Sequence, residues 1–335
     1  MIDQTQRAWC HAVSHMFPSE AEPCFETPEL LEKYWAGRKW GMNSEMGQLR
    51  MVMLHRPDEE INTIDESKYD SSLNAIIDVE KGYYYGGKTK PDLAKMQAEH
   101  DAYADVLRKN GVEVIYNNKY TNPGLVNCIN TRDIGTAIPG GIIIGRGSNH
   151  MRRGEELAAT RTLAEIGMPI LKTIHGTGTF EGGNFMFLDP KHAMCGYSTR
   201  TNLEGLRQLR ETLADIGIEL FIVQVPGHDL HIDGMITMID YDLALVDLRT
   251  VPFALLEKLK ELGIRYIEKA PDERTTAINL VPICAKKVVM IKGFEKTADI
   301  LYKNGIDVIE VEYEECMKKG GGLHCGTQAL IRDFV

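Results

Sequence analysis

One pattern occurs five times in this chain: LRKNGVEVIYN at residues 107–117, LAEIGMPILKT at 163–173, LADIGIELFIV at 213–223, LKELGIRYIEK at 259–269 and LYKNGIDVIEV at 301–311. Each copy reads as the end of an amphipathic helix, then a glycine, then alternating apolar residues. A glycine in the left-handed conformation commonly ends a helix, and a period of two is typical of a strand. The pattern therefore predicts five repeated helix-to-strand units.

Strand-rich segments precede each predicted helix, and several of them read as hairpins. They are MVMLHRP at 51–57, IPGGIIIGR at 138–146, GNFMFLDPKHAMCGYS at 183–198, GMITMIDYDLALVDL at 234–248 and LVPICAKKVVMIKGF at 280–294. A doubly wound parallel sheet has one strand per helix, whereas this chain offers two or three short strands per helix. We therefore predict an α/β fold in which the repeats form a ring, a five-fold pseudo-symmetric α/β propeller.

The predicted propeller occupies residues 49–335 as a single catalytic domain. Residues 1–48 differ from the rest in composition, since aromatic side chains stand among polar ones, and we expect an N-terminal helical extension there. Residues 57–90 are the longest stretch without a clear helix or strand pattern. A loop of that length in a compact domain is often a lid or binding loop, although a plain surface loop fits equally well.

Composition and charge narrow the expected partners. The chain of 335 residues has 38 basic and 48 acidic side chains, a net charge of −10, which argues against a nucleic-acid partner. Its apolar runs extend for only a few residues, so no membrane-spanning helix is expected. The first residues lack the pattern of a secretory signal, which favours a cytoplasmic location. A small soluble substrate is the expected partner, and a homo-oligomer is left open.

The seven cysteines are widely spaced and include no C-x-x-C pair. This spacing disfavours both a disulfide framework and a cysteine-ligated zinc site. Free thiols are expected, and we predict no metal and no cofactor.

Four polar clusters lie beside predicted strands, where the strand ends of such a ring converge near its axis. They are NCINTRD at 127–133, FEGGN at 180–184, HDLHID at 228–233 and GGGLHCG at 320–326. The last is the most informative, because three glycines permit the close backbone approaches that present a nucleophile. Cys325 is therefore the candidate nucleophile, with His324 beside it. His231 and Asp233 are expected to alternate along a strand and to share one face.

The acidic residues of these clusters, Asp133, Glu181 and Asp233, would repel one another in a pocket unless the ligand were a cation. A guanidinium suits such a pocket, because it is planar, always protonated and presents five N–H donors to carboxylates. We expect Asp133 and Asp233 to hold it. Its charge would stabilise the Cys325 thiolate, while His231 supplies and removes protons.

On these residues the chain resembles the guanidine-modifying enzyme superfamily, whose fold is the five-fold propeller called pentein, and it is most similar to arginine deiminase. The similarity runs in order from about residue 43 to the end. The segments that carry it are SEMGQLRMVMLHRP at 44–57, NTRDIGTAIPGGI at 130–142, FEGGNFMF at 180–187, HIDGMITMID at 231–240 and GGGLHC at 320–325.

The resemblance implies a role for each candidate. Cys325 would attack the guanidino carbon, His231 would be the general acid and base, and Asp133 and Asp233 would grip the guanidinium, with Glu181 beside the histidine. The family reaction passes through a covalent thiouronium-type intermediate, and with arginine and water it gives citrulline and ammonia.

The resemblance also implies where the amino-acid end of the substrate binds. Arginine deiminases contact the α-carboxylate through an asparagine and two arginines, whose positions match Asn127, Arg152 and Arg200 in this chain. His324 joins them as a substrate-binding candidate. These matches favour a free α-amino acid over agmatine, which has no carboxylate.

Departures from the deiminase pattern leave related reactions open. The usual E-G-G-D reads EGGN here, so Asn184 replaces an acid, and GTQALIRD at 326–333 is closer to agmatine deiminases. A dimethylarginine hydrolase, an arginine dihydrolase giving ornithine, or an amidinotransferase passing the amidino group to an amine would keep the same core. Amidinotransferases usually carry F-D-A-A where this chain has F-E-G-G, which favours hydrolysis.

A metal-dependent ureohydrolase is a rival interpretation, because Asp229, His231 and Asp233 have the D-x-H-x-D spacing of a di-manganese site. That interpretation leaves GGGLHC and the repeat unexplained. A nicotinamide dehydrogenase is weaker still, since Gly176-Thr177-Gly178 lacks the G-x-G-x-x-G spacing. A propeller that binds guanidines without turnover is the remaining alternative.

Overall fold

The computed structural model describes residues 8–9, 32 and 37–335. The chain divides into two compact units, Met1–Lys39 and Trp40–Val335, and every element named below belongs to the second. Of the helical extension predicted for residues 1–48, only residues 8–9, 32 and 37–48 are described, and the rest stays a prediction. Residues 37–48 form turns, bends and a bridge at Gly41 and contain no helix. Residues 40–48 belong to the second unit, where Gly41 exchanges backbone hydrogen bonds with Leu330 and Arg332.

The second unit consists of short strands and helices. Its strands are β1 (Leu49–Leu54), β2 (Tyr69–Asp70), β3 (Ala75–Asp78), β4 (Tyr83–Gly86), β5 (Glu113–Tyr116), β6 (Gly135–Ile138), β7 (Gly141–Ile144), β8 (Ile170–Thr173), β9 (Phe185–Asp189), β10 (His192–Tyr197), β11 (Glu219–Gln224), β12 (Ile236–Asp240), β13 (Leu243–Val246), β14 (Arg265–Glu268), β15 (Val281–Cys284), β16 (Lys287–Ile291), β17 (Asp307–Val311) and β18 (Gln328–Arg332). Its α-helices are α3 (Leu93–Lys109), α4 (Glu155–Glu165), α5 (Leu203–Ala214), α6 (Phe253–Glu261), α7 (Glu295–Lys303) and α8 (Glu314–Met317).

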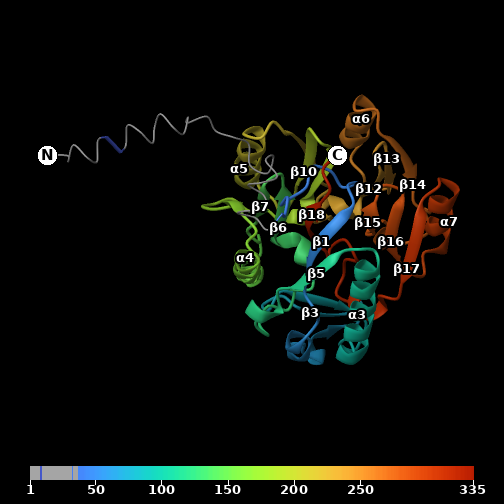
Figure 1. Cartoon of the computed structure of the whole chain (residues 1–335). Coiled ribbons are helices and arrows are strands. Elements are labelled where there is room, and N and C mark those ends of the chain that lie inside the picture. The colour runs from blue at the N-terminus through green and yellow to red at the C-terminus, as the bar shows by residue number, and fades with distance from the viewer. Residues whose placement is uncertain (1–7, 10–31, 33–36) are drawn as a thin grey trace. The chain divides into compact units, whose positions relative to one another are not determined.

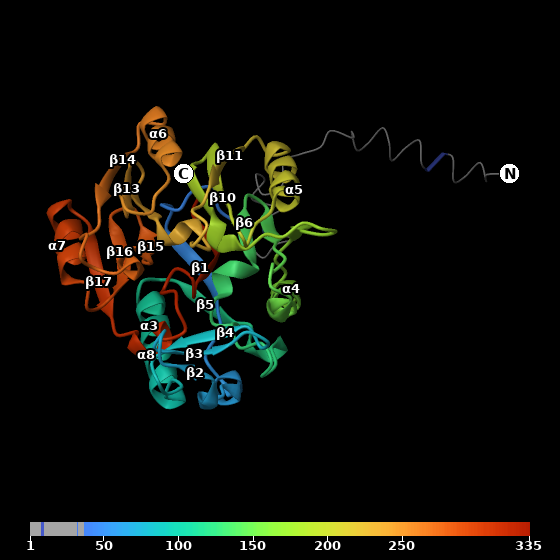
Figure 2. The ribbon, with the colours of Figure 1, turned by 180° about the vertical axis from the view of Figure 1, so that it is seen from behind.

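Five three-stranded sheets share one topology. In β6-β7-β8, β9-β10-β11, β12-β13-β14 and β15-β16-β17, the central strand pairs antiparallel with the strand before it and parallel with the strand after it. A parallel neighbour requires a crossover, and one of the helices α4 to α7 supplies it each time. The helices lie on the outer side of the sheets (Figures 1 and 2). The prediction of an α/β fold made of small repeated sheets is therefore confirmed.

The fifth sheet, β18-β1-β5, joins the two ends of the unit. The last strand, β18, pairs antiparallel with β1, and β1 pairs parallel with β5 after the crossover helix α3. Figure 1 shows β1 between the other two strands. This sheet has the same topology as the other four, although its strands come from opposite ends of the sequence.

The glycines of the repeated phrase end their helices as predicted. Gly111, Gly167, Gly217, Gly263 and Gly305 have φ angles of 79°, 80°, 74°, 72° and 76°. An L-residue with a side chain rarely adopts this conformation, which explains why glycine stands at each of these positions.

Residues 57–90 contain more regular structure than the sequence indicates. They form two short 3₁₀ turns, η1 (Glu59–Thr63) and η2 (Glu66–Lys68), and the antiparallel sheet β2-β3-β4. The expectation of one long loop is therefore wrong. Strands of two to four residues are too short for their alternation to stand out in a sequence.

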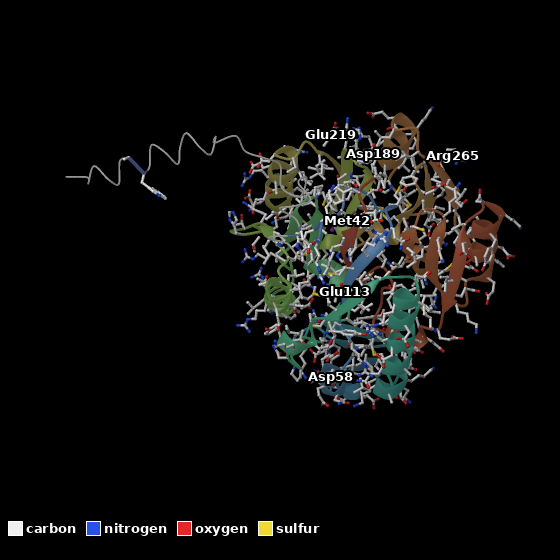
Figure 3. All side chains as sticks on the ribbon, viewed as in Figure 1. Met42, Asp58, Glu113, Asp189, Glu219 and Arg265 are labelled. Atoms are coloured by element: carbon white, nitrogen blue, oxygen red, sulfur yellow. The ribbon has the colours of Figure 1, made fainter. Side chains whose placement is uncertain are left out.

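The core lies between the helices and the sheets. α5, for example, buries Leu206, Leu209 and Leu213, which recur at helical spacing on one face. In Figure 3 the charged Asp58 and Arg265 lie at the edge of the molecule, while Met42, which is 1% exposed, lies near its middle. Among the described residues, no helix combines the length and the apolar character needed to span a bilayer.

The closure of the fifth sheet can be tested with Leu330→Ala. Leu330 lies in β18 and is fully buried, so its truncation should lower the free energy of unfolding by about 2–5 kcal/mol through lost packing and a cavity. Leu171→Ala is the matched control, because Leu171 also lies in a strand but is 43% exposed, and it should change stability by less than about 0.5 kcal/mol. Denaturant titration measures both. Equal stability of the two variants would contradict a packed role for β18.

Candidate active site

Five short turns lie just before the first strands of the five like sheets, and most of the candidate catalytic side chains lie in these turns or directly beside them. They are η4 (Thr131–Ile134), η6 (Gly182–Asn184), η7 (Ile232–Gly234), η8 (Thr275–Ile278) and residues 323–326. Neighbouring turns in this series contact each other from η4 to η8. Asn279, just after η8, bonds to Cys325, whose carbonyl accepts a 3.0 Å hydrogen bond from the backbone N–H of Arg132 in η4. The five turns therefore form a closed series, in which residues 323–326 contact both the region of η8 and η4.

A cavity of about 550 Å³ opens beside these turns and reaches the β2-β3-β4 sheet. Six of the predicted site residues line it: Asn127, Asp133, Arg152, Arg200, His231 and Cys325. The other three, Glu181, Asp233 and His324, are buried behind its wall and contact residues of the site. A larger groove of about 840 Å³ between α6 and β14 contains none of the nine.

Asn279 holds the candidate nucleophile from two sides. Its Nδ2 donates to the Cys325 sulfur at 3.1 Å, and its Oδ1 accepts from the Cys325 backbone N–H at 3.1 Å. The preceding glycine loop leaves room for the sulfur, because a Cβ on Gly321, which has a φ of 80°, would lie 3.1 Å from it. The thiol is therefore fixed in position and faces the cavity.

The Cys325 thiol stays protonated in the unliganded site. Burial, together with the negative charges of Asp233 and Asp133, raises its pKa well above the ordinary value, and the hydrogen bond from Asn279 opposes this only in part. Asp233 Oδ2 lies 3.7 Å from the sulfur. A cation that neutralised these carboxylates would make ionisation of the thiol easier.

Asp233 is held by His324. His324 Nδ1 lies 2.8 Å from Asp233 Oδ2. Burial raises the pKa of this carboxyl, but the hydrogen bond to His324, together with the electrostatic effect of the nearby His324, His231 and Arg132, outweighs burial and lowers it. His324 does not line the cavity within the described residues. It therefore acts on the site through Asp233 and does not reach the space where a substrate would lie.

His231 lies between two carboxylates. Its Nε2 is 2.8 Å from Glu181 Oε2, and its Nδ1 is 3.6 Å from Asp133 Oδ1. Burial lowers the pKa of this imidazole, but the charge of Asp133 and the hydrogen bond to Glu181 outweigh burial and raise it to about 9. His231 is thus a proton donor at neutral pH that faces the cavity.

The expectation that His231 and Asp233 alternate along a strand is wrong. Both lie in the turn before β12, where His231 precedes η7 and Asp233 belongs to it. The 3₁₀ geometry separates their partners, since His231 contacts Glu181 and Asp233 contacts His324. The apolar run that begins at Ile236 is the strand, and the polar residues before it form the turn.

Arg152 is fully engaged with acidic side chains. Its Nη1 donates to Asp133 Oδ2 at 2.7 Å, and its Nε and Nη2 donate to Glu155 at 3.1 and 2.7 Å. Burial disfavours its charge, but Glu155, Asp133 and Glu181 outweigh burial and raise its pKa well above the ordinary value. The other oxygen of Asp133, Oδ1, is buried and has no hydrogen-bond partner.

The two remaining substrate-binding candidates lie at the cavity wall. Arg200 Nη1 donates to both Glu181 oxygens at 3.2 and 3.3 Å. Asn127 donates to the carbonyl of Gly82, just before β4. Arg200 is thus tied to the carboxylate that contacts His231, and Asn127 is tied to the small sheet that covers one side of the cavity.

The geometry does not assemble the Asp229, His231 and Asp233 set of the ureohydrolase interpretation, since Asp229 pairs with His228. It groups Asp133, Glu181 and His231 instead, with one ligand atom of each within 4.8 Å of the others. Such donors suit divalent cations. However, Arg152 Nη1 lies 2.7 Å from Asp133 and 3.6 Å from Glu181, so a guanidinium already supplies the positive charge there.

Sequence reasoning missed three residues of this site: Asn279, Glu155 and Lys319. Asn279 stands in the turn before β15, the position that Asp133, Asp233 and Cys325 occupy before their own strands. Reading all five repeats in one register would have found it. Glu155 lies three residues after Arg152, a spacing typical of helical ion pairs, and Lys319 carries no motif signal.

Asn279→Ala should slow the alkylation of Cys325 by iodoacetamide about 10-fold or more at fixed pH. The thiolate would lose its amide donor, and a hydrogen bond to a charged group contributes roughly 1.5–3 kcal/mol. Mass spectrometry of the peptide that contains Cys325 measures the rate. Asn304→Ala, at the exposed end of α7, is the control. An unchanged rate in Asn279→Ala would show that this amide does not act on the sulfur.

Glu181→Gln should lower the pKa of His231 from about 9 by a unit or more. The Glu181 carboxylate favours the imidazolium, so its loss favours the neutral ring and shifts the titration to lower pH. Nuclear magnetic resonance of the His231 ring, assigned with His231→Gln, measures the shift. Glu211→Gln on the surface of α5 should leave it in place, and a His231 pKa near 9 in Glu181→Gln would contradict the assignment.

Comparison with known proteins gives the relationships of the chain. The model of the eukaryotic N,N-dimethylarginine dimethylhydrolase family matches residues 86–332. YkgA of Bacillus subtilis is 27% identical over 86% of this chain and 94% of its own length. An N(G),N(G)-dimethylarginine dimethylaminohydrolase of Pseudomonas aeruginosa is 26% identical over 70% of this chain and 89% of its own length. An arginine deiminase of Oenococcus oeni is 22% identical over 88% of this chain and 97% of its own length.

Solved structures share the fold. The Pseudomonas aeruginosa dimethylarginine dimethylaminohydrolase, in a cysteine-to-serine form complexed with citrulline, has a TM-score of 0.67 at 22% identity, over 85% of this chain and all of that one. The inosamine-phosphate amidinotransferase of Streptomyces griseus has a TM-score of 0.65 at 16% identity, over 88% of this chain and 97% of that one. With a family model matching most of its length, the chain belongs to the dimethylarginine dimethylaminohydrolase family of the guanidine-modifying superfamily.

Proposed function

We propose that this chain is a cysteine-dependent hydrolase that opens the guanidino group of L-arginine, or of an Nω-methylated derivative, to give citrulline. One observation carries the proposal. Cys325, His231 and Asp133 line a single cavity, and Asp133 keeps a buried oxygen, Oδ1, without a hydrogen-bond partner. A buried acceptor of this kind is costly unless a donor reaches it, and a guanidinium N–H supplies one.

Binding comes first in the proposed reaction. The planar guanidinium presents an N–H group to Asp133 at the cavity wall, and its positive charge opposes Asp133 and the Asp233 behind the wall, the two carboxylates that raise the pKa of the Cys325 thiol. Cys325 can then ionise beside the bound cation and release its proton to the solvent in the cavity. The sulfur lies 3.7 Å from Asp233, so the carbon held by these carboxylates is within its reach.

The chemical steps use Cys325 and His231. The thiolate attacks the guanidino carbon, and a sulfur–carbon bond forms. The carbon–nitrogen bond to the terminal nitrogen then breaks as protonated His231 gives that nitrogen a proton, and the amine leaves. Neutral His231 next takes a proton from water, whose oxygen attacks the same carbon, and the sulfur–carbon bond breaks to release the ureido product.

The remaining residues position these groups. Glu181 holds the His231 ring at 2.8 Å, and His324 holds Asp233 at 2.8 Å. Asn127, Arg152 and Arg200 stay our candidates for the amino-acid end of the substrate. We further propose that the five like sheets form a closed five-fold pseudo-symmetric propeller, which the return of the turn series to its start supports, and that the protein acts on a free amino acid in the cytoplasm.

The leaving group separates two candidate substrates. The sequence resemblance favours arginine and ammonia, whereas the family match over residues 86–332 favours Nω,Nω-dimethylarginine and dimethylamine. Both give citrulline through the same steps. A transferase would differ in its last step, because an amine would take the place of water.

The test is incubation of the full chain with L-arginine or with Nω,Nω-dimethyl-L-arginine, and mass spectrometry of citrulline, ornithine, ammonia and dimethylamine. Citrulline should form, and Cys325→Ala should lower the rate at least about 10³-fold. Cys284→Ala, a free thiol in β15, should keep it. Ornithine that appears only with an added amine acceptor would indicate an amidinotransferase, and citrulline formation by Cys325→Ala would overturn the mechanism.

A further inference from the structure

Asn130 borders the catalytic cavity with a side chain that no protein group uses. Three asparagines nearby, Asn127, Asn184 and Asn279, each donate a hydrogen bond through Nδ2 to a protein group. The Asn130 side chain forms no hydrogen bond with any residue that the structure describes. Its amide is therefore available to a ligand.

The local backbone explains why this amide faces the cavity. Asn130 stands just before η4, a position from which an asparagine side chain usually accepts a hydrogen bond from the backbone of the helix that follows. Here it accepts none, although the backbone N–H of Asn130 donates to Asn127 and its carbonyl accepts from Asp133. The backbone of Asn130 is thus fixed on both sides, while its side chain is left at the cavity wall.

The amide oxygen of Asn130 lies beside the candidate nucleophile. A Cβ on Gly321 would be 3.1 Å from the Cys325 sulfur and 3.7 Å from Asn130 Oδ1, so both atoms border the same point of the glycine loop. The carbon that the sulfur attacks must approach it to about 3–3.5 Å. A nitrogen bonded to that carbon therefore comes close to Asn130 Oδ1.

A bound guanidinium needs more acceptors than the carboxylates of the cavity wall supply. It presents five N–H donors, and a donor that loses its hydrogen bond to water without gaining another is costly. Asp133 Oδ1 accepts one of them, whereas Asp233 lies behind the wall. The Asn130 oxygen can accept another, and because it is uncharged it adds no negative charge beside the Cys325 thiol.

We propose that Asn130 Oδ1 accepts an N–H from one terminal nitrogen of the guanidinium while Asp133 Oδ1 accepts one from the other, so that the site prefers arginine to Nω,Nω-dimethylarginine. The inference rests on the proposed function, because it assumes that the guanidinium lies beside Cys325 and Asp133. In arginine both terminal nitrogens carry hydrogen. In Nω,Nω-dimethylarginine one of them carries two methyl groups, so either orientation leaves one acceptor without a donor, which a site of this kind discriminates against.

The first test uses the unaltered full chain. It compares kcat/KM for citrulline formation from L-arginine, Nω-methyl-L-arginine and Nω,Nω-dimethyl-L-arginine. The monomethyl compound keeps hydrogen on both terminal nitrogens and should stay within about 3-fold of arginine, whereas the dimethyl compound should be at least about 10-fold slower, the effect of one hydrogen bond to a charged group. Equal losses with one and two methyl groups would assign the preference to size and overturn the inference.

Asn130→Ala then removes the acceptor. It should lower kcat/KM for arginine roughly 10- to 100-fold and change that for the dimethyl compound by less than about 3-fold, so the ratio of the two falls. A general disturbance of Cys325 would lower both rates equally and leave the ratio in place. Asn130→Asp keeps an acceptor of the same size and should keep the ratio, although its charge lowers both rates. Asn304→Ala, at the exposed end of α7, is the control and should change neither rate.

The outcomes separate the possible failures. An unchanged ratio in Asn130→Ala would overturn the inference, as would a ratio that Asn130→Asp loses to the same extent. Citrulline formation from arginine and the dimethyl compound at equal rates would leave the proposed function standing and remove only the role of Asn130. If the full chain forms citrulline from none of the three compounds, the proposed function fails and the inference fails with it.

Discussion

The pairing of β18 with β1 is the constraint on which the site depends. It brings the last turn of the chain, residues 323–326, against η4, where Thr131 Oγ1 donates to the carbonyl of Gly326 across 195 residues of sequence. Cys325 and Asp133 meet only because this sheet is built from both ends of the unit. Contacts of such long sequence separation cost a large loop-closure entropy, so the position of the candidate nucleophile depends on a pairing that spans the whole unit.

Charge balance is the second requirement, because Asp133, Glu181 and Asp233 are all buried within one small region. Each acid has a cationic or hydrogen-bonding partner on one side: Arg152 for Asp133, His231 and Arg200 for Glu181, and His324 for Asp233. One acceptor remains, because Asp133 Oδ1 is 3.6 Å from His231 Nδ1 and has no hydrogen-bond partner among the described residues. In a low-dielectric interior an acceptor without a hydrogen bond is costly, and a cationic N–H donor would satisfy it.

Much of the fold could be predicted because its signals are local. A helix-ending glycine and a period-two strand leave their mark within eleven residues, and the structure confirms both at Gly111 and its four equivalents. The β2-β3-β4 sheet could not be predicted, because strands of two to four residues are too short to show an alternation of apolar and polar residues. The candidate site residues that belong to a motif were found from the sequence, whereas Asn279 and Lys319 reach the site only because of where the fold places them.

Asn184 stands where the deiminase pattern has an acid, and it helps to position His231. The side chain is fully buried; its Nδ2 donates to the carbonyl of Leu230, and its Oδ1 accepts from the backbone N–H of Ile232. Those two residues flank His231, so the amide fixes the backbone on both sides of this residue. A carboxylate at this position could accept but not donate, and it would add a negative charge three residues from Glu181. That charge would favour the imidazolium further, and it would disfavour the neutral His231 that the proposed mechanism needs as a proton acceptor.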